Sequence, residues 1–448
     1  MDSQSTAVSQ ETFQSPGDIS IDQIMIFALN GKYISVIDYL VELQLYESIF
    51  SNVLSGELSL SDSRNLIKEL PIVGEELLII KVKTPSLPDR YNISKTFKIY
   101  SIENRKIVRD QNTQIYKIKF ISQEATVDSI TPLFKPFKGK ISDVVQTIYN
   151  DYLQMPRTYD VTTNNTISLN KNNAELLLLN DTNNNVKFVS PGWTPLQCIN
   201  WLAKKSIPGD LKACTYLFWE TTKNFFYGSI ENLISKNITI GKYRYAATGV
   251  LGGTSDVESK MLLIQNLEVV KSTNTLDGLD TGYYSNKFVA LDLYKKQYQN
   301  TIYNHIDNFS NYSHLATEPL FTPNKTISSY DRNIVVYPTQ IDLFDGVTDN
   351  HDQKLNSVYA NRLSNLVDLN NLKLNVTING RTDVEVGRTI EIVFPSLEPV
   401  SEKDLTSENL DYRFSGNYLI TSLNHKINLE KHYIIMEVVR DSFAKIGK

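Results

Sequence analysis

The chain is poor in the residues from which proteins build covalent and metal chemistry. Its 448 residues include two cysteines, Cys198 and Cys214, and five histidines. Two cysteines cannot form a disulfide framework, so we expect a reducing compartment. The dispersed histidines form no His-Glu-x-x-His motif, and the sequence contains neither Cys-x-x-Cys nor Gly-x-Ser-x-Gly. These absences leave no candidate catalytic residue, metal-ligand set or cofactor site, and they predict that the protein is not an enzyme.

Long apolar runs and a surplus of positive charge are also missing. No apolar run approaches the length of about 18 residues that a membrane-crossing helix needs. The net charge of −5 and the pI near 5.7 argue against a dedicated nucleic-acid binder, which normally has a basic surface. Residues 1–19 are polar and lack the basic start and apolar core of a signal peptide, so we expect a disordered lead-in.

What the sequence does contain is a repeated stretch. PIVGEELLIIKVKTPSL begins at residue 71, and VEVGRTIEIVFPSL begins at residue 384. Aligned on their Val-Gly pairs, both copies read Val-Gly, two polar residues, an apolar strand and Pro-Ser-Leu. A glycine permits the positive φ of a turn and a proline ends strand pairing, so each copy predicts a turn, a strand and a strand exit. These turn and exit residues are Gly74, Pro85, Gly387 and Pro395.

Three further matches accompany the repeat in the same order. Residues 97–102 (FKIYSI) match 418–423 (YLITSL), and residues 116–120 (YKIKF) match 433–437 (YIIME). The third match is Leu-Ser-Leu at residue 58 with Leu-Lys-Leu at residue 372. Four matches in register predict an internal duplication. The predicted fold class is therefore β-rich α+β, with two duplicated antiparallel β-barrel domains and added α/β modules.

The two copies differ on one strand face in this alignment. The second copy has Thr389 and Glu391 where the first has apolar side chains, which need a cover. Lysines also alternate with apolar residues in two strands of the first copy. The alternatives for these lysines are a solvated outer face, a docking site for an acidic partner and the lining of a passage for a polyanion. The predicted assembly face comprises Leu78, Ile80, Val82, Lys81, Lys83, Lys117 and Lys119.

Helices and a hairpin are predicted between the two copies. Residues 141–152 and 194–203 carry apolar positions at helical spacing. Residues 214–230 predict an aromatic hairpin around a polar turn. Such rings either bind sugars or pack in a core, and core packing is the commoner use. The rings in question are Trp219, Phe225, Phe226 and Tyr227.

Two polar features are interpreted as surface structure. The acidic loop 345–352 lacks the ligand spacing and closing glutamate of a calcium loop. His425 and His432 are expected to face each other across a surface hairpin. Carboxylates are abundant, but a sequence does not show which of them meet in space.

Three motifs resemble the baseplate central hub subunit of contractile-tailed bacteriophages, a family related to hub parts of contractile injection systems. The helix SPGWTPLQCINWLAKKS and the hairpin YLFWETTKNFFYGSIENL resemble one signature of that family. GYYSNKFVALDLYKKQY resembles another, in which a Gly-Tyr turn leads into a strand and an Asp-x-x-x-Lys segment, here Asp292 and Lys296. With the duplication, the resemblance covers most of residues 20–445.

The resemblance implies a division of the chain. After the lead-in, it implies a first, tube-like β-barrel over residues 20–128 and a helix-containing outer module over 129–205. The second barrel would be discontinuous, from 206–248 plus 353–448, and residues 249–352 would form an inserted outer module.

The resemblance also implies an assembly. Family members form homotrimeric rings in which each chain contributes two barrels, so that a sixfold tail tube is matched to a threefold spike. The expected partners are the central spike protein, the tail tube or tube-initiator protein and baseplate wedge proteins, with DNA passing through without sequence-specific binding. The expected location is the tail baseplate of the virion, assembled in the bacterial cytoplasm from late proteins and used in genome ejection.

The alternative hypothesis is a tail-associated glycan-binding protein or glycan hydrolase built on β-domains. It predicts carboxylates paired in a cleft, or the hairpin's aromatic rings exposed in a row. The hub hypothesis predicts that the same rings are buried, so their exposure discriminates between the two.

Overall fold

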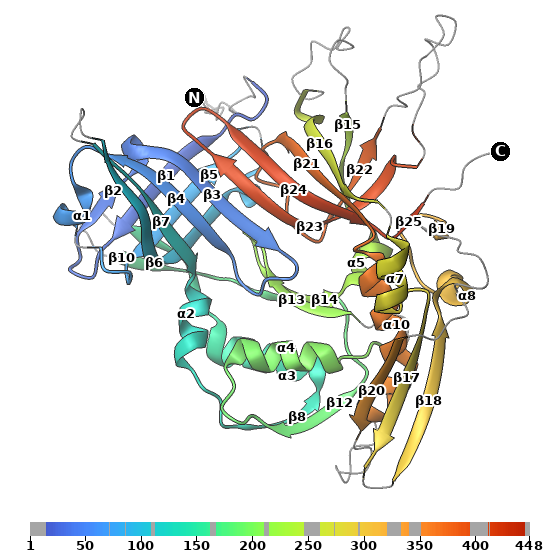
Figure 1. Cartoon of the computed structure of the whole chain (residues 1–448). Coiled ribbons are helices and arrows are strands. Elements are labelled where there is room, and N and C mark those ends of the chain that lie inside the picture. The colour runs from blue at the N-terminus through green and yellow to red at the C-terminus, as the bar shows by residue number, and fades with distance from the viewer. Residues whose placement is uncertain are drawn as a thin grey trace, which may run out of the picture.

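The computed structural model shows two β-barrels side by side, with a helical module beneath them and a separate sheet-and-helix unit at one end (Figure 1). No helix in the part of the chain that it describes is long and apolar enough to cross a membrane. The described residues are 15–70, 72–85, 87–108, 113–161, 167–209, 215–245, 260–272, 274–293, 296–319, 333–339, 351–394, 411 and 413–443.

The first barrel is built from the N-terminal strands, drawn in blue to teal in Figure 1. Their order in the sheet is β2-β1-β5-β6-β7-β4-β3, and every pair is antiparallel. In β3, β4 and β7 alternate residues point inward and are buried, as the period of two requires. The strands are β1 (Ser20–Phe27), β2 (Tyr33–Ser35), β3 (Leu40–Ser48), β4 (Ser55–Asp62), β5 (Leu77–Lys83), β6 (Ile93–Val108) and β7 (Thr113–Ser122), with the short helix α1 (Leu66–Glu69) between β4 and β5.

The second barrel closes on itself. Its strands follow the order β23-β22-β15-β16-β21-β24, and β24 pairs back onto β23. Most pairs are antiparallel, whereas β15 runs parallel to both of its neighbours. The strands are β15 (Thr239–Tyr245), β16 (Leu263–Lys271), β21 (Leu372–Asn379), β22 (Thr389–Val393), β23 (Gly416–Ile427) and β24 (His432–Arg440).

The two barrels are copies of one another, as the sequence predicted. The antiparallel order β5-β6-β7-β4 in the first barrel repeats as β22-β23-β24-β21 in the second. Both copies also carry a β-bulge at the same place, after Ile99 in β6 and after Ile420 in β23. A bulge is a specific local feature of a strand pair, so its repetition supports the duplication independently of strand order.

The alignment of the repeated strand was wrong by one residue. Leu78 lies opposite Phe97, and its structural counterpart Ile390 lies opposite Tyr418. The sequence alignment instead paired Leu78 with Glu391. Since side chains alternate between the two faces of a strand, a slip of one residue exchanges the inner face with the outer one.

The helical module lies beneath both barrels (Figure 1). Its helices pack around a third apolar core that includes Cys198. Thr194 begins α4 with a capping box, and a proline occupies the first turn. The elements are α2 (Gln123–Ile130), β8 (Pro136–Lys140), α3 (Ile141–Ile148) with a π-helical turn (Tyr149–Leu153), β9 (Pro156–Val161), β10 (Ile167–Asn173), β11 (Leu176–Leu178), β12 (Asn185–Val189) and α4 (Pro195–Lys205).

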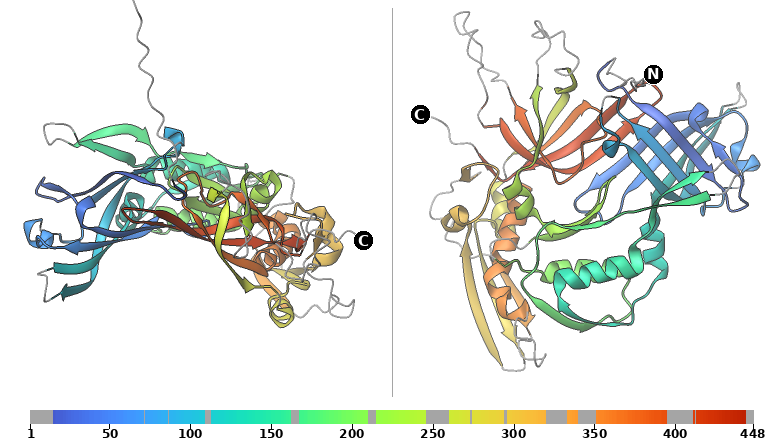
Figure 2. Two further views of the ribbon diagram at one scale, coloured as in Figure 1. Left: turned by 90° about the horizontal axis from the view of Figure 1, so that it is seen from above. Right: turned by 180° about the vertical axis from the view of Figure 1, so that it is seen from behind.

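The aromatic hairpin forms a layer between the module and the barrels, as Figure 2 shows from behind. Its strands β13 (Tyr216–Glu220) and β14 (Phe225–Ser229) pair with each other, and β14 also pairs with β11, so the hairpin forms a sheet of its own that is separate from the barrel strands. One face packs into the core of the helical module and the other, with Trp219, into the core of the second barrel. The resemblance implies that all of residues 206–248 belong to the second barrel, whereas of this range β15 lies in the barrel and α5 (Ile230–Lys236) connects the hairpin to it.

The unit at the other end of the molecule consists of a three-stranded sheet and a long helix. The sheet order is β18-β17-β20, and α10 packs against β17 and β18. The resemblance implies that all of residues 249–352 belong to this unit, whereas β16 belongs to the second barrel. The elements are α7 (Thr275–Thr281), β17 (Ser285–Asp292), β18 (Gln297–Asn304), α8 (His305–Asn308), β19 (Glu318–Pro319), β20 (Asn333–Thr339) and α10 (His351–Asp368); β19 pairs with β25 (Ser442–Phe443).

Candidate functional site

The two barrels are joined edge to edge by one strand pair. Residues 43–48 of β3 pair antiparallel with residues 422–427 of β23, which merges both barrels into one 13-stranded sheet. The pairing begins just after the bulge at Ile420, where β23 leaves its other neighbour β22. The bulge therefore frees an edge of β23 for the second barrel to use as its connection to the first.

A buried polar cluster lies at this junction. Glu47 is 2% exposed and accepts hydrogen bonds from the backbone N–H of Thr222 (3.0 Å) and of Val386 (3.4 Å). Burial, reinforced by the nearby charge of Glu385, raises the pKa of Glu47 to about 8. The Glu47 carboxyl is therefore largely protonated at neutral pH, which removes the cost of burying a charge.

Two histidines complete the cluster. His425 Nδ1 and His432 Nε2 are 3.0 Å apart and share a hydrogen bond, so the predicted facing pair is confirmed. The predicted surface position is wrong, because both side chains are fully buried. Burial, with the neighbouring His432, lowers the pKa of His425 well below its ordinary value, and burial lowers that of His432 to about 3. Both rings are therefore neutral, which suits a permanent junction between two barrels.

The apolar side chains of the predicted assembly face are inside the first barrel. Leu78, Ile80 and Val82 are at most 1% exposed and belong to its core. The counterparts of Leu78 and Ile80 in the second barrel are the equally buried Ile390 and Ile392, once the one-residue slip is corrected. These three side chains therefore need no external partner.

The lysines of the predicted face lie on the outside of the first barrel, where they are half-buried. Lys117 pairs with Glu57 at 2.9 Å, Lys119 with Glu103 at 2.8 Å and Lys83 with Asp22 at 3.9 Å. Lys81 is half-buried on the same side of β5 as Lys83. Because carboxylates on neighbouring strands balance these charges, the outer face is mixed in charge and is not a basic patch.

Both predicted turn glycines adopt the conformation that the sequence argument requires. Gly74 has a φ of 99° and Gly387 a φ of 80°, a region that side-chain-bearing residues rarely occupy. Pro85 follows the last residue of β5 by two positions. Pro395, like the acidic loop 345–350, lies outside the described residues.

A second buried charge cluster connects the first barrel to the helical module. Lys95 on β6 forms an ion pair with Glu220 on β13, and its Nζ lies 3.7 Å from Glu124 Oε2 on α2. Glu220 also accepts a hydrogen bond from the hydroxyl of Ser122 at 2.6 Å. Burial outweighs the lowering effect of Lys95 and raises the pKa of Glu124 to about 7. The cluster holds three elements from separate parts of the chain in one arrangement.

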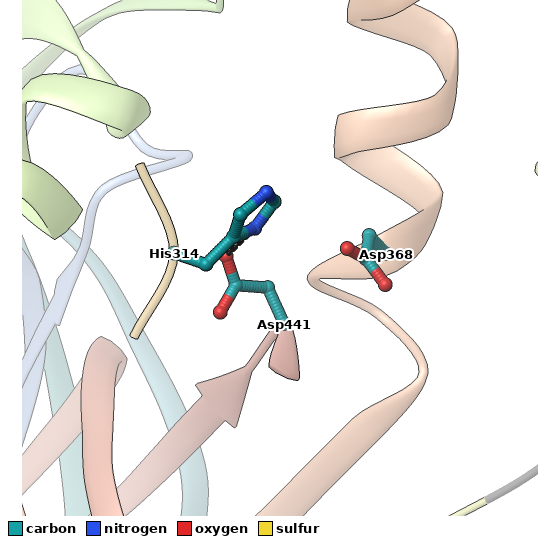
Figure 3. Close-up of side chains that lie close together, drawn as sticks. All are labelled: His314, Asp368 and Asp441. Carbon is teal, nitrogen blue, oxygen red and sulfur yellow. Dashed lines mark hydrogen bonds and ion pairs between the residues drawn. The ribbon is translucent and has the colours of Figure 1, made fainter. Parts of the chain in front are cut away.

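The one group of possible metal ligands found among the described residues consists of His314, Asp368 and Asp441 (Figure 3). One ligand atom from each residue lies within 4.8 Å of the others. His314 Nδ1 is 2.9 Å from Asp441 Oδ2, and its Nε2 donates to the carbonyl of Phe309 at 2.8 Å.

Because both ring nitrogens of His314 face oxygen acceptors, this histidine is stable as the doubly protonated cation. Burial lowers the pKa of His314, but the hydrogen bond and charge of Asp441 outweigh that effect and raise it. The shared proton occupies the Nδ1 lone pair that a metal ion would need. The arrangement thus acts as an ion pair that fixes the segment around residue 314 to the end of β24.

The aromatic hairpin offers no row of exposed rings. Trp219, Phe225 and Tyr227 are at most 1% exposed, and Phe226 stacks on Trp219 with ring centroids 5.5 Å apart. This burial is what the hub hypothesis predicts, and it removes the aromatic platform on which the glycan-binding hypothesis depended.

Sequence reasoning missed the buried charges, although a signal was present. Glu47 follows Leu43 and Leu45 at the inward positions of β3, and Lys95 alternates with Ile93 and Phe97 in β6. A charged residue at an inward position of an alternating strand predicts a buried polar contact. Its partners come from distant parts of the sequence, so only the fold identifies them.

Comparison with known proteins finds likeness in structure alone. No protein-family profile matches this chain, and no curated protein matches its sequence. A tail protein from Neisseria meningitidis MC58 superposes with a TM-score of 0.52 at 10% identity, over 94% of this chain and 96% of the other. The 43 kDa tail protein of prophage MuSo2 from Shewanella oneidensis also gives 0.52, at 8% identity over 94% and 98%. The chain therefore has the fold of phage tail proteins.

Proposed function

We propose that this protein is the structural hub subunit of a phage tail baseplate. Three copies form a ring of six barrels that joins the tail tube to the central spike, and DNA passes through its channel. The observation that carries this proposal is that two barrels, which share the strand order β5-β6-β7-β4 and β22-β23-β24-β21, are fused into one continuous sheet within a single chain.

The fused pair of barrels explains how two symmetries can meet. Threefold rotation of a chain with two similar barrels produces six similar units around one axis. Such a ring presents near-sixfold contacts to a tail tube and threefold contacts to a spike or to wedge proteins. The likeness to two solved tail proteins over almost their whole length supports this assignment, which places the protein in the virion tail.

The charge pattern supports a passive role towards DNA. The outer lysines of the first barrel are balanced by carboxylates on adjacent strands, and the whole chain has a net charge of −5. A surface without a basic excess binds a polyanion weakly, so DNA can slide past it without sequence recognition. We assign no catalytic role to any residue of the chain.

The test is the solution mass of the purified, tag-free chain, measured by light scattering across a wide concentration range. We expect a species near three times 51.0 kDa and, in electron micrographs, a six-lobed ring. A chain that stays monomeric throughout, alone and with a trimeric spike protein added, would refute the hub assignment.

A further inference from the structure

Two strand edges lack a second neighbouring strand among the residues that the structure describes. From Ser101 onward, β6 pairs with β7 on one side, whereas its pairing with β5 ends at Lys98 and a last bond from the N–H of Ile99. On β16, residues beyond Ile264 pair with β21 on one side, and β15 reaches only Leu263 and Ile264 on the other. Among the described residues, neither edge has a second neighbouring strand.

These open edges are the duplicates of the edges that join the two barrels. The free part of β6 begins after its bulge, as the part of β23 that binds β3 begins after the equivalent bulge. β16 occupies the same place beside β21 that β3 occupies beside β4. In the first barrel, the edge of β3 is therefore paired with the other barrel and the edge of β6 is open. In the second barrel, the edge of β23 is paired and the edge of β16 is open.

We infer that β16 of one copy pairs antiparallel with β6 of the next copy and thereby repeats, between chains, the β3–β23 junction found within each chain. This inference rests on the proposed ring, and it names the contact that closes it. Three such pairings leave neither strand edge open, which removes the exposed backbone donors and acceptors that otherwise promote aggregation.

The duplication also fixes the register. Within the chain, Lys426 lies opposite Gln44 and Ile427 opposite Leu43. When the buried residues of β7 are aligned with those of β24, Lys106 becomes the counterpart of Lys426. When the buried residues of β4 are aligned with those of β21, Glu268 becomes the counterpart of Gln44. The same matching places Ile107 opposite Leu267. The repeated junction therefore brings Lys106 of one copy to Glu268 of the next.

The side chains at these positions fit each other. Lys106 and Glu268 are exposed and opposite in charge, and opposite charges on directly facing strand positions stabilise a strand pair. Ile107 is 69% exposed and Leu267 only partly buried, so pairing covers apolar surface that the single chain leaves to water. A second copy supplies both the charge and the apolar surface that the open edges lack.

The experiment is disulfide cross-linking of the full chain that carries Lys106→Cys and Glu268→Cys. Directly opposed strand residues have Cα atoms about 4.5–5.5 Å apart, within the range of a disulfide. The matched control is Lys106→Cys with Val269→Cys, because adjacent residues of a strand point to opposite faces. All three positions are exposed, so the cysteines leave the fold intact.

We expect mild oxidation to give a three-chain covalent species with the first pair and at least about 10-fold less with the control. A trimer by light scattering that yields no more cross-linking than the control overturns the strand pairing and leaves the hub assignment standing. A chain that remains monomeric overturns both.

Discussion

Replacing Glu47 by glutamine tests how the buried junction responds to pH. The pKa of Glu47 is raised from 4.5 to about 8, so the folded protein holds a proton that the unfolded chain releases. The contribution of protonated Glu47 to the unfolding free energy is fully present below pH 4.5 and is lost as the pH rises through 8. At about 1.4 kcal/mol per pKa unit, wild-type protein loses about 3 kcal/mol by pH 7 and about 5 kcal/mol by pH 9.

Glutamine keeps the shape of the protonated acid and cannot ionise. The difference in unfolding free energy between Glu47→Gln and wild type should therefore grow in favour of the variant between pH 5 and pH 9. Urea unfolding followed by tryptophan fluorescence at five pH values measures this difference, and other titrating groups cancel from it. Glu430→Gln, at an exposed position in the β23–β24 turn, is the control and should follow the wild-type curve. Parallel curves for wild type and Glu47→Gln would show that Glu47 is ionised in the folded protein and refute the reasoning.

Three further changes have defined outcomes. Lys95→Met leaves two carboxylates buried without their cation, so we expect a loss of about 3–5 kcal/mol that is smaller at pH 5.5 than at pH 8 in thermal unfolding. Gly56→Ala places a methyl group against an aromatic ring and a backbone carbonyl of the first barrel, so we expect it to lower the unfolding free energy by about 1–3 kcal/mol in the same assay. The control is Gly209→Ala, whose added methyl group has its nearest neighbour at 3.9 Å and should lower the unfolding free energy by less than about 1 kcal/mol. Lys106→Glu places like charges across each chain contact and should weaken the trimer by roughly 0.5–1 kcal/mol per contact in light scattering, and adding Glu268→Lys should restore it.

The duplication was predictable because its signals are local. A glycine with positive φ before an apolar strand and a proline after it can be found in one short stretch, and Gly74 and Gly387 confirm the glycine part. The aromatic hairpin was predictable for the same reason, since two β-prone runs flank a polar turn. Its partner strand was not predictable, because the hairpin is apolar on both faces and packs on both sides.

The register of the repeated strand could not be read from the sequence. Residues 77–80 are four consecutive apolar residues, so the period of two that identifies the inner face is absent. The outward-pointing Ile79 is buried as fully as Leu78 and Ile80, because other parts of the chain cover that face of β5. Only the cross-strand partners decide the register, and those partners come from β6 and β23.

The β3–β23 junction and the open edges of β6 and β16 differ in their side chains, and the difference fits the proposed order in which they are covered. The β3–β23 junction forms as each chain folds, and it contains Glu47 and His425, which are fully buried and gain from never meeting water. In the proposed ring, the edges of β6 and β16 stay in water until another copy binds, and they carry Lys106 and Glu268, which are exposed in the single chain. The equivalent facing pairs are Lys426 with Gln44 within the chain and Lys106 with Glu268 in the proposed contact, so the two junctions differ by one carboxylate, which gives the contact between copies its opposite charges.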